Sequence, residues 1–310
     1  MHEIEIQEIP PLSAGEHSLV RMHSVVNTIN VLIGELTMTG FEIARDERHF
    51  SEGLRHAERF SNSLSDPDAA LAGAAEVDEL RRVVLDEFEA KVPASRSNDP
   101  EIALGRSNLQ SALAILQVRA REILARAGCP DPMKRFELAL LARDLDDFLA
   151  AMERNSRGRY RIVRNISLKT PTDYYFDFKV ESSLSGPAFR APFLYMPHVF
   201  QDVMRDLIAN ARKYTAVGGN ILAAARQDRE GVVFAIEDNG RGIPPGQIRD
   251  VVQFGKRANN VGDVRSLGGG FGLTKAFLAT KQFGGRFWIA SELGRGTRVR
   301  IQLPITPPAV

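Results

Sequence analysis

The sequence predicts an α+β protein in which an all-helical N-terminal half precedes a half that combines strands with helices. Apolar residues recur at alternating three- and four-residue steps from Leu19 to Leu36, as in a helix of a bundle. From Tyr174 onward, apolar and polar residues alternate in short runs, as in strands with one buried face. We expect the boundary near residue 156, with a helical region over 1–156 and a mixed domain over 157–310.

Length and composition restrict the class of protein. A chain of 310 residues with 44% hydrophobic and 25% charged residues is typical of a soluble, two-domain globular protein. The net charge of +1 provides no field that would recruit nucleic acid or an anionic membrane. No apolar run approaches the roughly 20 residues that span a bilayer, and the N-terminus does not resemble a signal peptide. A lone cysteine, Cys129, excludes an intrachain disulfide and favours the cytoplasm.

The N-terminal half begins with an extended lead-in over residues 1–14. Helices are then expected over residues 15–44, 77–91, 101–127 and 133–153. The first helix is apolar on more than one face, so we expect a bundle that a second subunit completes, as in a homodimer. The polar stretch 45–64 either extends this helix or forms a connecting one. We interpret residues 45–100 as a segment inserted into the helical region.

A further helix is predicted over residues 200–214, near the start of the mixed domain. Its apolar residues recur every three or four positions and form one stripe. A second stripe at helical spacing consists of polar side chains: Asp202, Asp206, Asn210 and Lys213. One face of this helix is therefore available for polar chemistry.

The turn Asp238–Pro244 follows an alternating strand that contains Phe234 and Ile236. A carboxylate that ends a strand before a Gly-x-Gly turn lies where the backbone can closely approach a ligand. The same residue types also build ordinary turns, so a capping role for Asp238 is the alternative.

Two more glycine motifs follow. Residues 268–273, Gly-Gly-Gly-Phe-Gly-Leu, precede an amphipathic segment that ends near Phe283. Glycines before a helix leave backbone N–H groups free to cradle phosphates. The last turn, Gly294–Thr297, leads into a closing strand that ends near Leu303.

In this order, residues 206–214, 238–244, 268–273 and 291–297 resemble the N, G1, G2 and last glycine boxes of the histidine-kinase ATP-binding domain. Phe254-Gly255 resembles a remnant of the F box. Four linked motifs in the right order are far more specific than any one of them. The resemblance implies the Bergerat fold, a two-layer α/β sandwich with a mixed sheet, which binds ATP with Mg²⁺.

The resemblance also implies roles for single residues. Asn210 is expected to supply an oxygen to Mg²⁺, and Lys213 to neutralise phosphate charge. Asp238 is expected to accept a hydrogen bond from the adenine amino group, with Thr297 holding a bridging water beside it. The other residues expected at the nucleotide are Tyr214, Gly240, Gly242, Gly268, Gly270, Gly272 and Leu273. Residues 254–267 would form a lid over the phosphates.

Asp206 stands where this family usually has Asn. Its carboxylate would either bind Mg²⁺ through water, as a further metal ligand, or repel phosphate and slow turnover. Relatives that hydrolyse ATP, such as gyrase B and the heat-shock chaperones, use a Glu near this end of the helix. The sequence therefore leaves ATP hydrolysis open.

Residues 23–36 resemble the H box of histidine kinases in their apolar rhythm. His23 would be the phosphoacceptor, as a solvent-facing imidazole near neutral pH. Ser24 stands where the family has Glu or Asp. Asn27, one helical turn further on, matches the position that orients water for dephosphorylation of a partner. The alternatives are that His23 is an ordinary surface histidine or that His17 is the acceptor.

These motifs predict a cytoplasmic histidine kinase that transfers the γ-phosphoryl group of ATP to His23 and then to the receiver domain of a response regulator. Two other functions are consistent with the same motifs. A nucleotide-binding scaffold or degenerate kinase without phosphotransfer would account for Ser24 and Asp206. A serine kinase of the mitochondrial dehydrogenase-kinase type would also have an all-helical N-terminal half.

Overall fold

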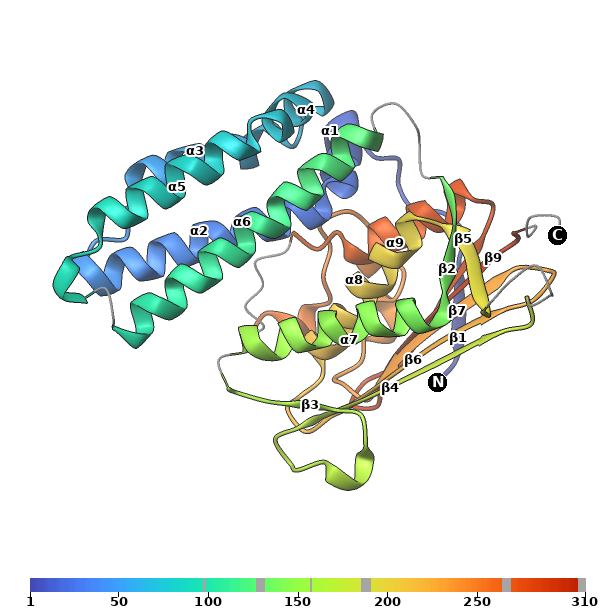
Figure 1. Cartoon of the computed structure of the whole chain (residues 1–310). Helices are drawn as coiled ribbons and strands as arrows, with labels where there is room; N and C mark the ends of the chain where they lie inside the picture. The colour runs from blue at the N-terminus through green and yellow to red at the C-terminus, as the bar shows by residue number, and fades with distance from the viewer. Residues whose placement is uncertain (97–98, 127–131, 157, 185–190, 264–268, 306–310) are drawn as a thin grey trace. The chain divides into compact units, whose positions relative to one another are not determined.

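The computed structural model describes residues 1–96, 99–126, 132–156, 158–184, 191–263 and 269–305 (Figure 1). Contacts divide the chain into two compact units. The first, the sheet unit, comprises Met1–Pro10, Asp131–Arg265 and Gly270–Val310. The second, the helical unit, comprises Pro11–Pro130 and Ser266–Gly269. Within the described ranges, no helix is long and apolar enough to cross a bilayer.

This division differs from the expected boundary at residue 156. Strand β1, Glu3–Ile6, pairs antiparallel with β8, Arg286–Glu292, so the expected lead-in is an edge strand of the sheet. Helix α7, Leu138–Asn155, buries Leu141 and Leu145 in the core of the sheet unit. Helical periodicity shows that one face of a helix is buried, but it does not identify what covers that face.

The helical unit contains six α-helices among its described residues. Their bounds are α1 Ala14–Arg21, α2 His23–Ala44, α3 Ser51–Ser63, α4 Pro67–Ala75, α5 Val77–Lys91 and α6 Pro100–Arg126, with a 3₁₀ turn at Ala94–Arg96. The expected helix over 15–44 is interrupted at Met22, where φ is −90° and ψ is 9°. The expected insertion is helical and belongs to the same core, because its residues Phe50 and Phe88 are buried in one cluster with Leu32 and Leu36 of α2.

The buried seam of α2 agrees with the expected one (Leu19, Met22, Val26, Ile29, Ile33 and Leu36) at Ile29 and Leu36. The innermost residues are Val25, Ile29, Leu32 and Leu36. The expected seam members Leu19, Met22, Val26 and Ile33 lie beside them, partly buried. Because α2 carries apolar residues on most faces, periodicity alone does not select the innermost one. Val31, Met38 and Phe41 remain 40–44% exposed.

A seven-stranded sheet dominates the sheet unit, in the order β1-β8-β9-β7-β6-β4-β3. Its further strands are β3 Ile162–Val163, β4 Tyr174–Ser182, β6 Asn220–Gln227, β7 Val232–Asp238 and β9 Gly296–Leu303. Pairs β3–β4 and β4–β6 are parallel and the others antiparallel, which confirms the predicted mixed sheet. Strands β2, Met133–Glu137, and β5, Phe193–Pro197, form a separate antiparallel pair.

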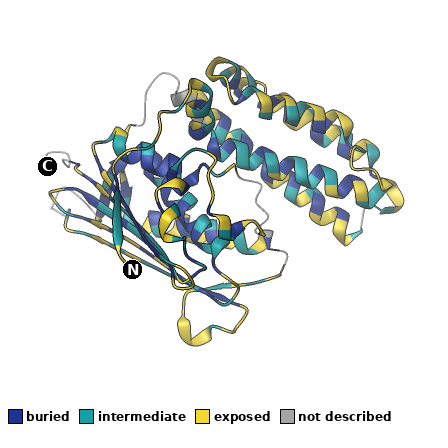
Figure 2. Ribbon diagram, turned by 180° about the vertical axis from the view of Figure 1, so that it is seen from behind, coloured by how far each residue is buried: buried dark blue, intermediate teal, exposed yellow. Residues whose placement is uncertain are grey.

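Helices α7, α8 (Val199–Tyr214) and α9 (Gly272–Gln282) cover one face of this sheet (Figure 1), which confirms the α/β sandwich. Alternate residues of β6 and β7 are buried, as period-two patterning requires. Phe200 of α8 stacks on Phe234 of β7 with centroids 5.8 Å apart in this core. Buried residues occur in both the helices and the strands of this unit (Figure 2). Short 3₁₀ turns at Ile166–Leu168, Pro245–Gln247, Asp250–Val252 and Asn259–Val261 complete the unit.

Candidate functional site

The end of α8, the turn after β7 and the β8–β9 hairpin meet at one end of the sheet. The backbone N–H of Arg241, in the turn, donates to the carbonyl oxygen of Tyr214 at the end of α8 (3.1 Å). The N–H of Gly294, in the hairpin, donates to the carbonyl oxygen of Arg241 (2.9 Å). Three of the four predicted motifs are therefore joined by main-chain hydrogen bonds.

Asp238, the last residue of β7, lies at the centre of this meeting point. Its Oδ1 accepts the backbone N–H of Gly240 (2.9 Å) and that of Thr297 (3.3 Å). Among the described residues, none donates a hydrogen bond to Oδ2. Burial raises the pKa of Asp238 to about 6, although the two N–H donors act in the opposite direction. One oxygen thus performs the expected capping role, and the other remains for a donor from a ligand.

Two glycines of this turn are required by close backbone contacts. A Cβ on Gly240 would lie 2.5 Å from the carbonyl oxygen of Tyr214. Gly242 has φ of +68°, and a Cβ there would lie 2.1 Å from the carbonyl oxygen of Glu292. Both glycines were predicted to contact nucleotide, and the structure shows that packing inside the protein already accounts for them.

Ser291 is a residue of this site that the sequence did not single out. Its Oγ accepts the N–H of Ile243 (2.8 Å), donates to the carbonyl oxygen of Gly296 (2.9 Å) and lies 2.8 Å from Oγ1 of Thr297. It therefore joins the turn after β7 to the hairpin that carries Thr297. A buried serine inside a strand has no distinguishing pattern, and its place in the last glycine box was the one signal available.

Two residues of the polar stripe, Asn210 and Lys213, lie near the end of α8 at Tyr214, whereas Asp202 is buried in its first turn. Asn210 is half-buried, and its amide makes no hydrogen bond with the described part of the chain. Burial, together with the nearby charges of Arg257 and Arg212, lowers the pKa of Lys213 to about 8. The ammonium of Lys213 also lies 5.0 Å from the ring centroid of Tyr214. Lys213 and Arg257 thus form a concentration of positive charge that a polyphosphate would relieve.

Asp206 does not stand alone on this stripe. Its Oδ2 lies 2.8 Å from Nζ of Lys275, in the first turn of α9. Both side chains are largely buried, with 17% and 8% of their surface exposed. The carboxylate is therefore neutralised by a lysine, which neither of the roles predicted for Asp206 included.

The expected lid begins and ends at neighbouring points. Phe254 and Phe271 stack with ring centroids 4.5 Å apart, and Gly270, at φ +80°, approaches the backbone of Gly255. The guanidinium of Arg241 donates to the carbonyl oxygen of Asn260 (2.8 Å) and to the carboxylate of Asp263 (2.7 Å). These contacts tie the described part of the lid to the turn after β7.

The remaining motif residues lie at the start of α9. Gly272 is the first residue of this helix, and Leu273 packs against the core of the sheet unit. The first N–H groups of a helix have no intrahelical partner, so this end can receive an anion. Gly268 and residues 264–267 of the lid lie outside the described residues.

The predicted phosphoacceptor belongs to the helical unit. His23 is the first residue of α2 and is 6% exposed, so the expectation of a solvent-facing ring is wrong in this structure. Its Nε2 lies 3.2 Å from Nδ2 of Asn27, as the spacing of one helical turn predicted. His17, the other candidate, is exposed on α1.

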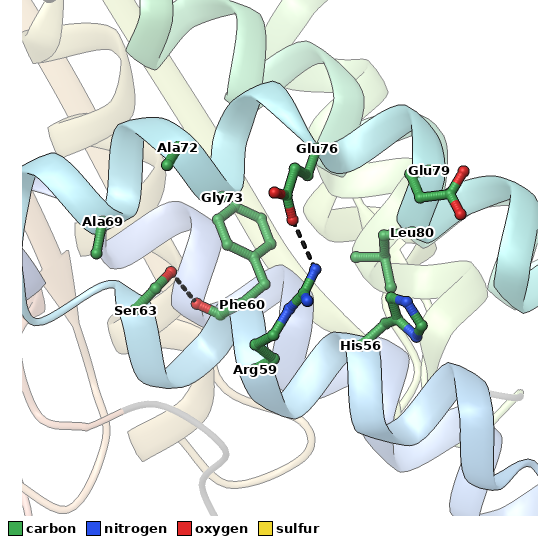
Figure 3. Close-up of a pocket in the computed structure, with 10 residues that line it drawn as sticks. All are labelled: His56, Arg59, Phe60, Ser63, Ala69, Ala72, Gly73, Glu76, Glu79 and Leu80. Atoms are coloured by element: carbon green, nitrogen blue, oxygen red, sulfur yellow. Dashed lines mark hydrogen bonds and ion pairs between the residues drawn. The ribbon is translucent and has the colours of Figure 1, made fainter.

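A separate pocket of about 290 Å³ lies among α3, α4 and α5 of the helical unit (Figure 3). Gly73 lies against the ring of Phe60, and Arg59 forms an ion pair with Glu76 (2.6 Å) across the pocket. None of the residues predicted to bind nucleotide or accept phosphate lines it. In the described ranges, no group of three or more His, Cys, Asp or Glu side chains is placed to hold a metal ion.

Comparison with known proteins connects the sheet unit to a family. Residues 197–307 match the family described as histidine kinase-, DNA gyrase B-, and HSP90-like ATPase. The adaptive-response sensory kinase SasA of Synechococcus elongatus is 34% identical over 116 residues, which are 37% of this chain and 30% of that protein. The sensor histidine kinase RppB of Synechocystis sp. is 32% identical over 103 residues, or 33% of this chain and 23% of that protein. The chain thus spans less than a third of the length of these curated relatives.

Solved structures of histidine kinases were also found. The catalytic domain of histidine kinase ThkA aligns with 57% of this chain and 97% of its own, with 17% identity and a TM-score of 0.40. The mycobacterial sensor histidine kinase MprB aligns with 57% of this chain and 100% of its own, with 18% identity and a TM-score of 0.39.

Proposed function

We propose that the chain belongs, through residues 197–307, to the histidine kinase family of ATPases and that its sheet unit binds Mg·ATP at the end of α8 and β7. The observation that carries this proposal is the environment of Asp238. Its Oδ1 is fixed by two backbone N–H groups, and its Oδ2 is left for a donor. An ionised carboxylate only accepts hydrogen bonds, so it favours the amino group of adenine over the carbonyl of guanine.

The residues around Asp238 suit the remainder of a nucleotide. Asn210 presents an amide oxygen of the kind that Mg²⁺ accepts, and few protein ligands are needed when phosphates supply others. When bound, Mg²⁺ would neutralise phosphate charge. Lys213 and Arg257 add positive charge beside it, and the start of α9 offers backbone N–H groups.

For the phosphoryl transfer, we propose His23 as the acceptor. A bond would form between Nε2 and the γ-phosphorus while the bond from that phosphorus to the β,γ-bridging oxygen breaks, which releases ADP. The amide of Asn27 beside Nε2 holds the ring with its proton on Nδ1, so the lone pair of Nε2 faces the amide (3.2 Å). The phosphoryl group would then pass to an aspartate of a response-regulator receiver domain.

We also propose that the helical unit forms a homodimer through α2 and α6, which pack along each other. Large apolar side chains remain exposed on both helices. They are Val31, Met38, Phe41, Leu104, Ile115, Val118 and Leu124, each 40–53% exposed. Apolar surface gathered on two adjacent helices is typical of a face that a further pair of helices covers.

The test is incubation of the full chain with Mg·[γ-³²P]ATP, followed by acid and alkali treatment of the labelled protein. Phosphohistidine is labile in acid and stable in alkali, so label of this kind that disappears in His23→Gln supports the proposal. His17→Gln is the matched control and should keep the label. Label that persists in a folded His23→Gln protein contradicts the assignment of His23.

A second candidate is a nucleotide-binding scaffold that transfers no phosphoryl group. The observation that favours it is the burial of His23, which is 6% exposed and so poorly placed to meet a substrate in this conformation. Calorimetry would select this candidate if the protein bound Mg·ATP tightly while no label reached protein in the experiment above.

A further inference from the structure

We infer that Asp206 and Lys275 form a clamp that sets the start of α9 against the polar stripe of α8, so that Asp206 is a positioning residue and not a ligand of Mg²⁺. The inference rests on the proposed nucleotide site, because its functional consequence is the placement of the groups that would hold the phosphates.

The clamp joins the two helices that carry the predicted phosphate and metal contacts. Nζ of Lys275 lies 2.8 Å from Oδ2 of Asp206, and α8 and α9 pack along each other. Asp206 lies one helical turn before Asn210 on the same stripe. Lys275 is the fourth residue of α9, and its own N–H donates to the carbonyl oxygen of Phe271 (2.8 Å), so it directly follows the N–H groups that have no intrahelical partner. The ion pair thus connects the neighbourhood of Asn210 to the anion-binding end of α9.

Charge explains why the two residues depend on each other. A lysine in the first turn of a helix is disfavoured by the positive end of the helix dipole. The side chain of Lys275 is also only 8% exposed, so water solvates its ammonium poorly. The carboxylate of Asp206 offsets both effects. Removal of Asp206 would leave the ammonium of Lys275 as an uncompensated, largely buried charge, and removal of Lys275 would take this ammonium away from the carboxylate of Asp206.

The same geometry argues against a metal role for Asp206. Its Oδ2 is engaged by Lys275, and coordination of a cation by this carboxylate would leave the ammonium of Lys275 without its counter-charge next to that cation. Asn at position 206, usual in the family, would keep the size of the side chain but would not neutralise Lys275. The carboxylate of Asp206 therefore serves as the counter-charge of Lys275 and not as a ligand of the Mg²⁺ that the nucleotide would bring.

The experiment is a double-mutant cycle in the full chain with Asp206→Asn, Lys275→Gln and the double variant. Melting temperature and ADP affinity are measured, the latter by calorimetry with Mg²⁺ and again with a chelator. Each single variant should melt lower and bind ADP roughly tenfold more weakly under both conditions. The double variant, a neutral pair, should recover most of both losses. Glu5→Gln, which breaks an ion pair at the β1 edge of the sheet, should leave the ADP affinity unchanged.

Two results would overturn the clamp. One is an Asp206→Asn variant that loses affinity only when Mg²⁺ is present while Lys275→Gln binds normally, because that pattern belongs to a metal ligand. The other is a double variant whose losses equal the sum of the single losses, because independent residues behave in this way. A wild-type protein that binds no ADP would instead overturn the proposed function, and with it the positioning role, whatever the melting temperatures show.

Discussion

The side-chain amide of Asn27 lies 3.2 Å from Nε2 of His23, one turn further along α2. If Nε2 attacks the phosphorus, its lone pair must first leave this hydrogen bond. We predict that Asn27→Ala increases the initial rate of ³²P labelling of His23 by about fivefold, since a hydrogen bond of this kind contributes roughly 1 kcal/mol. Thr28→Ala, which removes a hydroxyl bonded to the carbonyl oxygen of Ser24, is the control and should label at the wild-type rate. Slower labelling by a folded Asn27→Ala protein would count against this role.

We predict that the ionised carboxylate of Asp238 lowers the free energy of unfolding of the nucleotide-free protein at neutral pH. Burial raises its pKa from 3.8 to about 6, so the folded state binds the proton more tightly than the unfolded state. The resulting stabilisation is complete below pH 3.8 and is lost as the pH rises through about 6. Asp238→Asn removes this pH dependence and should raise the free energy of unfolding at pH 7.5 by up to about 3 kcal/mol. Urea unfolding at pH 4 and pH 7.5 measures the difference, and an equal effect at both pH values contradicts it.

Lys213 should take up a proton when nucleotide binds. Its pKa is about 8 because of burial and the charges of Arg257 and Arg212, so much of it is neutral at pH 8.5. Phosphate nearby favours the charged form. Calorimetry at pH 8.5 in two buffers of different ionisation enthalpy should then show uptake of more than half a proton per nucleotide. Lys213→Arg, already charged, should bind with no such uptake; wild-type binding heats that do not depend on the buffer would refute the assignment.

The N-terminal strand should stabilise the sheet unit. Ile6 is 1% exposed, and β1 places Glu5 opposite Trp288 of β8. Ile6→Ala should lower the free energy of unfolding by about 2–4 kcal/mol, as for other buried isoleucines. The fluorescence of Trp288, the one tryptophan of the chain, reports unfolding of this unit directly. Glu8→Ala, at an exposed position, is the control, and an equally small effect of both variants would show that β1 contributes little.

The proposed dimer depends on apolar side chains of α2 and α6. Ile115 is 49% exposed on α6, so Ile115→Glu places a charge in the proposed interface without filling a core position. Light scattering after size-exclusion chromatography should show a monomer, or a dimer dissociating at concentrations at least tenfold higher than the wild type. Leu168→Glu, at a residue 68% exposed in the sheet unit, should dimerise normally. A monomeric wild-type protein would contradict the proposal.

Helices, strands and turns that have a recognisable pattern of residue types could be predicted from the sequence. The strand before Asp238, the helix that carries Asn210 and the glycine turns between them have periodicities that burial on one face imposes. The partners of an element were not predictable in the same way. Strand β1 and helix α7 each have a buried face, and only the folded chain shows that the sheet unit covers it.

The same distinction holds for the residues of the candidate site: those within a motif were predictable, and those that depend on a distant partner were not. Asp238 and Asn210 stand in motifs with a fixed order, so the sequence identified them. Lys275 looked like one lysine of an amphipathic helix, because nothing local in the sequence relates it to Asp206, which lies 69 residues earlier. The burial of His23 was likewise hidden, since α2 is apolar on most of its faces and its innermost seam could not be selected from spacing alone.

The central claim is that Asp238 selects adenine in a site for Mg-nucleotide. The most direct measurement is calorimetric titration of the wild-type protein with ADP and with GDP in the presence of Mg²⁺. The proposed geometry predicts that ADP binds and that GDP binds at least roughly 100-fold more weakly, since it would set a carbonyl against a carboxylate. Equal affinity for the two nucleotides, or no binding of ADP, would contradict it.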